Sequence, residues 1–159
     1  MSARAALVGL VSDTHGLVRP EALDALRGVE RIVHAGDVGG REVLDALAAV
    51  APVVAVRGNN DRGPWADALP GSEVIEVAGR TLFVLHDLAE LDLDPVAAGF
   101  DAVISGHSHR PRVEERRGVL YVNPGSAGPR RFTLPIAVAR LRIDGEAIAA
   151  EIVELSPRP

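Results

Sequence analysis

Apolar runs alternate with amphipathic segments through the first 60 residues of the chain. Three short apolar runs are typical of buried strands, at 5–11, 31–34 and 53–56. Between them, 20–27 opens with proline and is followed by Gly28, and 41–50 carries apolar residues at helical spacing, so both are predicted helices. Because strand–helix–strand units cross over right-handedly, we expect the three strands to lie parallel.

The pattern changes after residue 70, where strand-like runs follow one another closely. Residues 73–78 and 81–85 are predicted to form a hairpin around Gly79 and Arg80. Further on we expect a short helix at 95–98, a buried strand at 102–104 and antiparallel strands at 112–115, 119–122, 136–143 and 147–154. The chain is therefore predicted to be an α/β protein.

The composition is that of an ordinary globular chain. The 159 residues suit one domain, 1–159, with 47% apolar and 25% charged residues and no apolar stretch near the roughly 18 residues of a membrane helix. The absence of cysteine excludes disulfides, thiolate metal sites and a cysteine nucleophile. The N-terminus runs directly into strand-like sequence without a cleavable signal pattern, so we expect a cytoplasmic location and no membrane partner.

The charge of the chain argues against nucleic acid as a partner. A net charge of −5 and a pI near 5.5 disfavour a stable nucleic-acid complex. One part of the chain is nevertheless rich in arginine, namely Arg110, Arg112, Arg116, Arg117, Arg130 and Arg131. We interpret this cluster as solvated strand and loop surface. The sequence leaves open whether the chain forms a homo-oligomer.

Polar side chains of metal-binding type follow five of the predicted strands. They are Asp13 and His15, Asp37, Asn59 with Asn60 and Asp61, His86 with Asp87, and His107 with His109. Open α/β sheets place their sites at the carboxyl ends of the strands. A single aspartate after a strand is usually a turn residue, and a lone histidine is usually structural. Five strand ends that agree indicate a site.

The spacing and type of these residues favour a metal centre. Residues i and i+2 of extended backbone project to the same side, which applies to Asp13 with His15 and to His107 with His109. Glycine, which allows a close approach to an ion, stands directly before Asp37, Asn59 and His107. Ligands of this kind without thiolate suit Mn, Fe, Zn or Ni. Seven of these residues are the candidate ligands, and seven are too many for one tetrahedral ion but suit two ions that share a carboxylate. They are Asp13, His15, Asp37, Asn59, His86, His107 and His109.

The ordered set D-T-H, G-D, G-N-N-D, H and G-H-S-H resembles the signature of calcineurin-like metallophosphoesterases. With V-N-P-G-S at 122–126 and the short length, the chain is similar to the small prokaryotic YfcE-like phosphodiesterases over residues 7 to about 131. The resemblance implies a four-layer αββα sandwich, with two mixed β-sheets flanked by helices. It also implies one ion at Asp13, His15, Asp37 and His109 and a second at Asp37, Asn59, His86 and His107.

Such a centre implies a dinuclear metal-dependent phosphoesterase, with manganese as the expected ion and iron, zinc or nickel as alternatives. We expect a metal-bridging hydroxide to attack the phosphorus of a small phosphodiester of nucleotide type, with Asp37, Asn60 and His107 as catalytic residues. Asn123, Ser126 and Arg130 are expected to contact substrate, although N-P-G-S is also a plain turn sequence.

Asn60 is the main departure from the family pattern. Many members carry histidine here, thought to protonate the leaving oxygen or to hold the phosphate. An amide donates hydrogen bonds but no proton at neutral pH, so we expect Asn60 to contact substrate while the general-acid contribution is missing or comes from elsewhere. A second departure is His86-Asp87-Leu88, where small members commonly have H-G-H.

Two other functions stay open. The same fold could carry a binding or scaffold protein with little or no catalysis, as the related retromer subunit does, or a phosphomonoesterase. A scaffold is free to lose metal ligands, whereas every ligand position is filled here, which favours the enzyme.

Four residues beside the candidate ligands have mainly structural interpretations. His34 lies within its strand and is expected to be structural. Asp61 and Asp87 are expected either to orient a ligand histidine or to stabilise a turn. Trp65 is expected to pack or to contact another subunit rather than to line a base-binding pocket.

Overall fold

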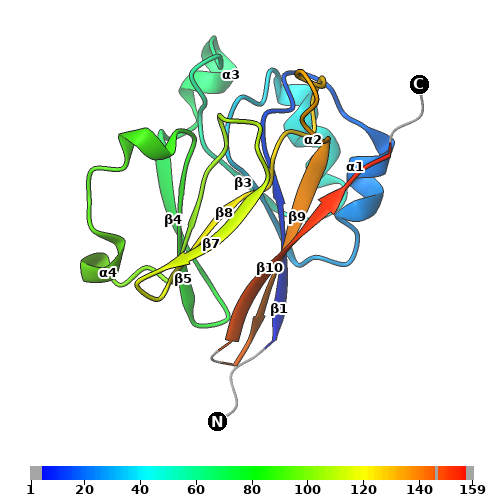
Figure 1. The fold of residues 1–159 in the computed structure, drawn as a ribbon. Helices are drawn as coiled ribbons and strands as arrows, with labels where there is room; N and C mark the ends of the chain where they lie inside the picture. Colours follow the sequence, from blue (N-terminus) through cyan, green and yellow to red (C-terminus); the bar gives the residue numbers. More distant parts are fainter. Residues whose placement is uncertain (1–4, 146, 157–159) are drawn as a thin grey trace.

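The computed structural model describes residues 5–145 and 147–156, which form two five-stranded sheets (Figure 1). The ends of the predicted 1–159 domain and residue 146 lie outside the described residues. The first sheet contains β1 (Ala6–Val11), β2 (Arg31–His34), β3 (Val53–Ala55), β9 (Ala137–Asp144) and β10 (Ala147–Glu154). The second contains β4 (Ser72–Val77), β5 (Arg80–Leu85), β6 (Ala102–Ile104), β7 (Arg112–Arg116) and β8 (Val119–Asn123).

Both sheets are mixed, with parallel strands at the centre. In the first, ordered β10-β9-β1-β2-β3, strands β1 to β3 are parallel as predicted, and β9 and β10 are antiparallel. In the second, ordered β4-β5-β6-β8-β7, strands β5, β6 and β8 are parallel and the predicted β4–β5 hairpin is present. The carboxyl ends of the parallel strands therefore meet at one edge, at the top of Figure 1.

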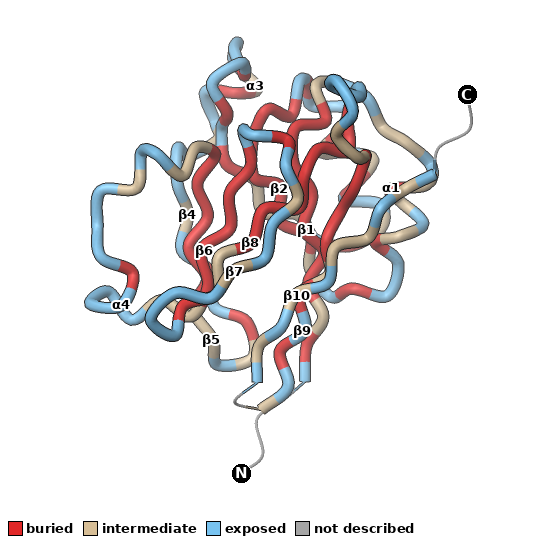
Figure 2. Tube along the Cα trace, viewed as in Figure 1, coloured by how far each residue is buried: buried red, intermediate tan, exposed pale blue. Residues whose placement is uncertain are grey.

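The main core lies between the two sheets. It is built from alternate side chains of the central strands, among them the fully buried Leu10, Leu82, Ile104 and Leu141. Figure 2 shows these strands as the most buried part of the chain, whereas β7 is largely exposed.

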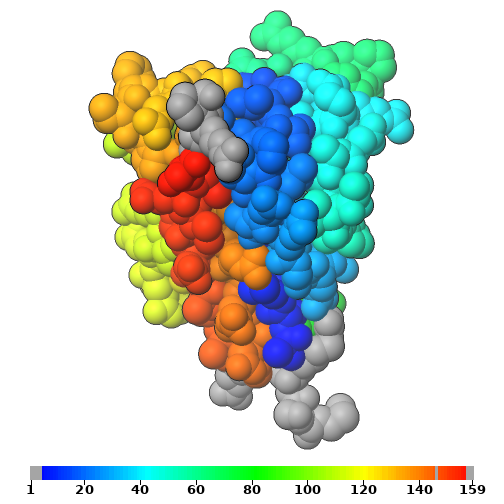
Figure 3. Space-filling view, turned by 90° about the vertical axis from the view of Figure 1, so that its right-hand side faces the viewer, coloured from blue at the N-terminus to red at the C-terminus, as the bar shows by residue number. Residues whose placement is uncertain are grey.

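Helices cover the outer face of each sheet to different extents. Over the first sheet lie α1 (Pro20–Ala25) and α2 (Arg41–Ala48), in the blue to cyan part of the chain that covers this side of the molecule in Figure 3. Leu26, directly after α1, and Val43 and Leu47 of α2 belong to one buried cluster with Ile32 of β2. Within the described part of the chain, the helices over the second sheet are α4 (Pro95–Ala98) and the 3₁₀ helix η1 (Leu88–Glu90), beside a small apolar cluster. The predicted sandwich is confirmed, with a thin fourth layer that leaves part of the second sheet uncovered.

Two short helices escape prediction, α3 (Pro64–Asp67) and η1. Each is about one turn long, so neither has the repeating apolar spacing that identifies a helix in a sequence. The longest helix among the described residues, α2, has 8 residues, and none of the described helices has the length and apolar character to cross a membrane.

Candidate metal centre

The loops at the carboxyl edge bring the predicted ligands together, but to different degrees. Asp13, Asp37, His86 and His109 are buried, whereas His15 is half-buried and Asn59 and His107 are exposed. These side chains come from the loops after β1, β2, β3, β5 and β6. The two sheets therefore contribute to one site, as expected from the five strand ends.

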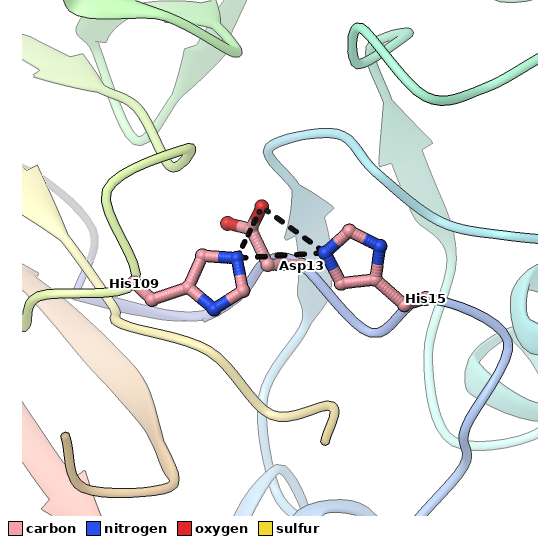
Figure 4. Close-up of side chains that lie close together, drawn as sticks. All are labelled: Asp13, His15 and His109. Carbon is pink, nitrogen blue, oxygen red and sulfur yellow. Dashed lines mark hydrogen bonds and ion pairs between the residues drawn. The ribbon is translucent and has the colours of Figure 1, made fainter. Parts of the chain in front are cut away.

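The first group of side chains consists of Asp13, His15 and His109 (Figure 4). The Nε2 atoms of the two histidines lie 3.4 Å apart. Asp13 Oδ1 lies 3.4 Å from His109 Nε2 and 3.8 Å from His15 Nε2. Three ligand atoms thus converge on one small volume, in the way that a metal ion requires.

The second group consists of Asp13, Asp37 and His86. Nε2 of His86 lies 3.4 Å from Asp37 Oδ2 and 3.8 Å from Asp13 Oδ1. Asp37 Oδ2 also lies 3.7 Å from Nε2 of His15, a member of the first group. Both carboxylates therefore lie between the histidines of the two groups, which is the arrangement that two neighbouring cations need.

Asn59 and His107 belong to neither group among the described residues. Oδ1 of Asn59 lies 3.2 Å from His107 Nδ1, and the His107 ring stands edge-on to that of His86 with centroids 5.2 Å apart. Asn59 and His107 therefore lie beside the second group, on the side that is exposed to solvent.

The backbone at the candidate ligands is strained. Positive φ angles occur at Asp13 (55°), His15 (47°), Asp37 (57°), His107 (72°) and His109 (63°). A left-handed backbone conformation destabilises a residue other than glycine by about 1 kcal/mol or more. Residues in this conformation are often found at functional sites. The i and i+2 pairs are therefore in turns rather than in extended backbone. Asp13 and His15 still converge, but His107 and His109 face different partners.

Glycines allow the ligand loops to pack closely. A Cβ on Gly36 would stand 2.6 Å from His86 Nδ1, and one on Gly58 would overlap the backbone nitrogen and Oδ1 of Asp37. A Cβ on Gly106 would stand 2.7 Å from Asp13 Oδ2. Each glycine that precedes a candidate thus lies against a different candidate, so its small size keeps the loops together.

Hydrogen bonds hold the two carboxylates in place. Asp13 Oδ2 accepts from Ser12 Oγ at 2.6 Å and from the His107 backbone at 3.0 Å. Both oxygens of Asp37 accept from Asn60, Oδ1 from its backbone at 2.9 Å and Oδ2 from its amide at 3.0 Å. The sequence had no signal for Ser12, because a serine beside an aspartate is common in turns.

Burial and hydrogen bonding together shift the pKa values of the centre. Burial alone would raise the pKa of Asp37, but the nearby His86 imidazole, 3.4 Å away, and hydrogen bonds from Asn60 lower it well below its usual range. Burial opposes protonation of His86, yet the nearby carboxylates of Asp37 and Asp13 raise its pKa. Burial lowers the pKa of His109 despite the nearby Asp13. Asp37 is therefore ionised at neutral pH, as metal ligation requires.

Two buried atoms fit a cation at this place. Asp13 Oδ1 and His86 Nε2 are buried without a hydrogen-bond partner, which is costly for a polar atom. His86 Nδ1 donates to the Ala35 carbonyl at 2.8 Å, so the Nε2 lone pair faces the centre. A bound divalent ion would satisfy both atoms, so the residues present fit the metal that the sequence predicts.

His34 connects two ligand loops without facing the centre. Its Nδ1 accepts from the Gly36 backbone at 3.0 Å, so the ring is the neutral tautomer with hydrogen on Nε2, which bonds Thr14 Oγ1 at 2.9 Å. Thr14 in turn donates to the Val38 carbonyl at 2.8 Å. Complete burial lowers the pKa of His34 to about 3.

We therefore expect the free energy of unfolding to decrease as the pH is lowered below about 6.5. The unfolded chain binds a proton at His34 there and the folded chain does not until about pH 3, so this residue contributes a slope of about 1.4 kcal/mol per pH unit. Urea unfolding of the wild type and of His34→Gln at pH 7.5, 6.0 and 5.0 measures the difference. Parallel pH dependences in the two proteins would contradict the prediction.

The remaining predicted residues bind backbone or face solvent. Asn123 donates to the Gly106 carbonyl, and Ser126 donates to the Asp13 carbonyl at 3.0 Å. Arg130 is exposed. Substrate contacts by these three stay predictions.

The two neighbouring aspartates stabilise loops. Asp61 accepts from the backbone of Val38, Gly39 and Gly58, which ties the loop after β3 to the loop after β2. Asp87 caps η1 through Ala89 and lies 3.8 Å from His107 Nε2.

Known proteins resemble the chain in sequence and in fold. Residues 7–146 match the model of the calcineurin-like phosphoesterase superfamily domain. A probable metallophosphoesterase of Methanothermobacter thermautotrophicus is 39% identical over 92% of this chain and 91% of its own.

Solved structures agree on the fold. Vacuolar protein sorting 29 from Cryptosporidium parvum has a TM-score of 0.80 at 21% identity, covering 96% of this chain and 92% of its own. A novel archaeal phosphodiesterase has a TM-score of 0.77 at 23% identity, covering 92% of this chain and 99% of its own. At these identities the structural likeness shows the fold alone.

Proposed function

The chain belongs to the calcineurin-like phosphoesterase superfamily, and from that premise we propose that it hydrolyses phosphodiesters at a centre of two divalent ions. The observation that carries the proposal is the pair of ligand groups that share Asp13, with Asp37 Oδ2 close to a histidine of each group. The archaeal phosphodiesterase of the same fold supports the choice of diesters. Manganese is the proposed ion, with iron, zinc or nickel as alternatives.

We assign the ligands as the family pattern implies. One ion would be held by Asp13, His15, Asp37 and His109, and the other by Asp37, Asn59, His86 and His107. Bound ions would supply Lewis-acid chemistry, in which they activate water and neutralise the phosphate oxygens. His107 has 46% of its side chain exposed, so it is accessible to an incoming ester.

Other residues position this machinery. Asn60 directs both oxygens of Asp37, since its backbone and its amide each donate to one of them. Asn123 holds the loop that carries His107, and Ser126 holds the backbone of Asp13. One N–H of the amide is committed to Asp37 Oδ2, and only the other is left to donate to substrate. We therefore propose that its first role is to orient Asp37.

Asn60→Ala is expected to weaken manganese binding and turnover by about 10- to 100-fold each, because groups that orient a ligand typically contribute that much. Calorimetric titration of the metal-free protein with MnCl₂ measures the affinity. Asn60→Asp keeps the side-chain shape but sets a second carboxylate against Asp37, and serves as a comparison. Unchanged manganese affinity in Asn60→Ala would show that the Asn60 amide does not orient Asp37.

The proposed reaction is tested with two chromogenic esters. Metal-free protein is supplied with Mn, Fe, Zn or Ni and assayed on bis(p-nitrophenyl) phosphate and on p-nitrophenyl phosphate. We expect the diester to be hydrolysed faster, with manganese most effective. Faster hydrolysis of the monoester would indicate a phosphomonoesterase.

A second candidate function is a binding protein on this fold. The likeness to vacuolar protein sorting 29, at a TM-score of 0.80, favours it. Bound metal without hydrolysis of either ester would support this candidate over the enzyme.

A further inference from the structure

A cavity of about 260 Å³ opens beside the candidate metal centre. One wall is the loop 106–108, which carries His107, and another is a face of the β7–β8 hairpin. Asn123 joins the two walls, because its Nδ2 on β8 donates to the Gly106 carbonyl at 2.9 Å. The cavity and the centre are therefore adjacent and share His107.

The hairpin presents a row of charged side chains to this cavity. Antiparallel pairing sets Arg112 opposite Asn123 and Glu114 opposite Tyr121. Because side chains alternate along a strand, Arg112, Glu114 and Arg116 lie on the same face as Tyr121, and all of them line the cavity. Part of the arginine cluster that the sequence suggested to be solvated surface thus borders a cavity next to the centre.

The cavity has an excess of positive charge. Glu114 contacts both Arg112 Nη2 at 2.6 Å and Arg116 Nη2 at 2.9 Å. Arg110 also lines the cavity, and its side chain has no ion pair within residues 5–145 and 147–156. Three arginines face two carboxylates, Glu114 and Asp87, so an anion is favoured.

The far wall of the cavity suits a planar group. The Arg116 guanidinium stacks over the Tyr121 ring at 5.0 Å from its centroid. This pair offers a flat, polar surface of the kind on which a nucleobase stacks.

A second cavity, of about 210 Å³, borders the centre at Asn59 and His86 and has the opposite charge balance. It is lined by one arginine, Arg57, and by two carboxylates, Asp87 and Glu90. An anionic part of a substrate is therefore directed toward the β7–β8 hairpin.

We propose that the cavity at Arg110, Arg112 and Arg116 binds a further phosphate on one arm of the diester, so that the preferred substrates are nucleotide-type diesters with an additional phosphate. This rests on the proposed function, because the scissile diester occupies the metal centre. The added phosphate forms an ion pair with Arg110 and competes with Glu114 for an ion pair with Arg112.

The test compares two dinucleotides that differ by one phosphate, TpT and the 5′-phosphorylated pTpT. Cleavage of the internal diester is followed by chromatography in the manganese-loaded protein. We expect kcat/KM to be at least tenfold higher for pTpT. In Arg110→Gln/Arg112→Gln this preference falls to about twofold or less, whereas Arg142→Gln, an exposed arginine on β9, keeps it. An equal kcat/KM for the two dinucleotides in the wild type would overturn the proposal.

A binding measurement separates this proposal from the proposed reaction. Thymidine 3′,5′-bisphosphate is expected to bind about tenfold more tightly than thymidine 3′-monophosphate by calorimetry, and the double variant is expected to lose the difference. If no diester is hydrolysed but the difference in binding is present, the reaction is wrong and the subsite stands. Equal affinities would overturn the subsite, whatever the activity.

Discussion

Asp37→Asn is expected to lower the turnover of bis(p-nitrophenyl) phosphate by about 10³-fold. Asp37 Oδ2 lies 3.7 Å from His15 Nε2 and 3.4 Å from His86 Nε2, so its charge serves both groups of ligands. Asparagine keeps the shape but removes that charge. Lewis-acid stabilisation contributes several kcal/mol, and each 1.4 kcal/mol is a factor of ten in rate. Steady-state kinetics at saturating manganese measure the loss.

The control is Asp45→Asn, which makes the same change at an exposed carboxylate on α2. It is expected to retain wild-type turnover and manganese stoichiometry. Manganese titration should show weaker or incomplete binding in Asp37→Asn only. Wild-type turnover in Asp37→Asn would contradict the role of this carboxylate.

Gly58→Ala is expected to disrupt the centre although it changes no ligand. The added methyl group would overlap the backbone nitrogen and Oδ1 of Asp37, and Asp37 Oδ1 is held by the Asn60 backbone at 2.9 Å. One loop must move, so we expect a loss of about 1 to 3 kcal/mol in the free energy of unfolding. Manganese affinity and turnover should fall by tenfold or more, because Asp37 is displaced.

Gly71→Ala is the matched control, since a Cβ at Gly71 meets no atom within 4 Å. Its free energy of unfolding should stay within about 0.5 kcal/mol of the wild type. Urea unfolding and manganese titration of both variants test the pair. Equal behaviour of the two would show that the close contact at Gly58 is not required.

Much of the fold could be predicted because its elements repeat a local pattern. Buried positions are apolar, so strands β1, β2 and β3 are visible as apolar runs and helix α2 as apolar residues at helical spacing. The helices η1 and α3 were missed because one turn has no period. The thin layer over the second sheet also has no local signature, since it depends on how loops pack.

The sequence predicted which residues form the site better than it predicted their contacts. Parallel pairing brings Asp13 and Asp37 to one edge of the first sheet, and His86 follows a parallel strand of the second, so strand ends alone indicated them. The partners of Asn60 and Asn123 depend on which loop lies opposite, and no short-range pattern encodes that. Similarly, the left-handed backbone at His107 and His109 separates two side chains that extended backbone would have aligned.

The proposed function requires two ions at one centre, and anomalous diffraction at the manganese edge tests for them most directly. Crystals of the wild type grown with manganese should show two peaks. One should contact Asp13, His15, Asp37 and His109, and the other Asp37, Asn59, His86 and His107. A single peak, or peaks outside these side chains, would contradict the account.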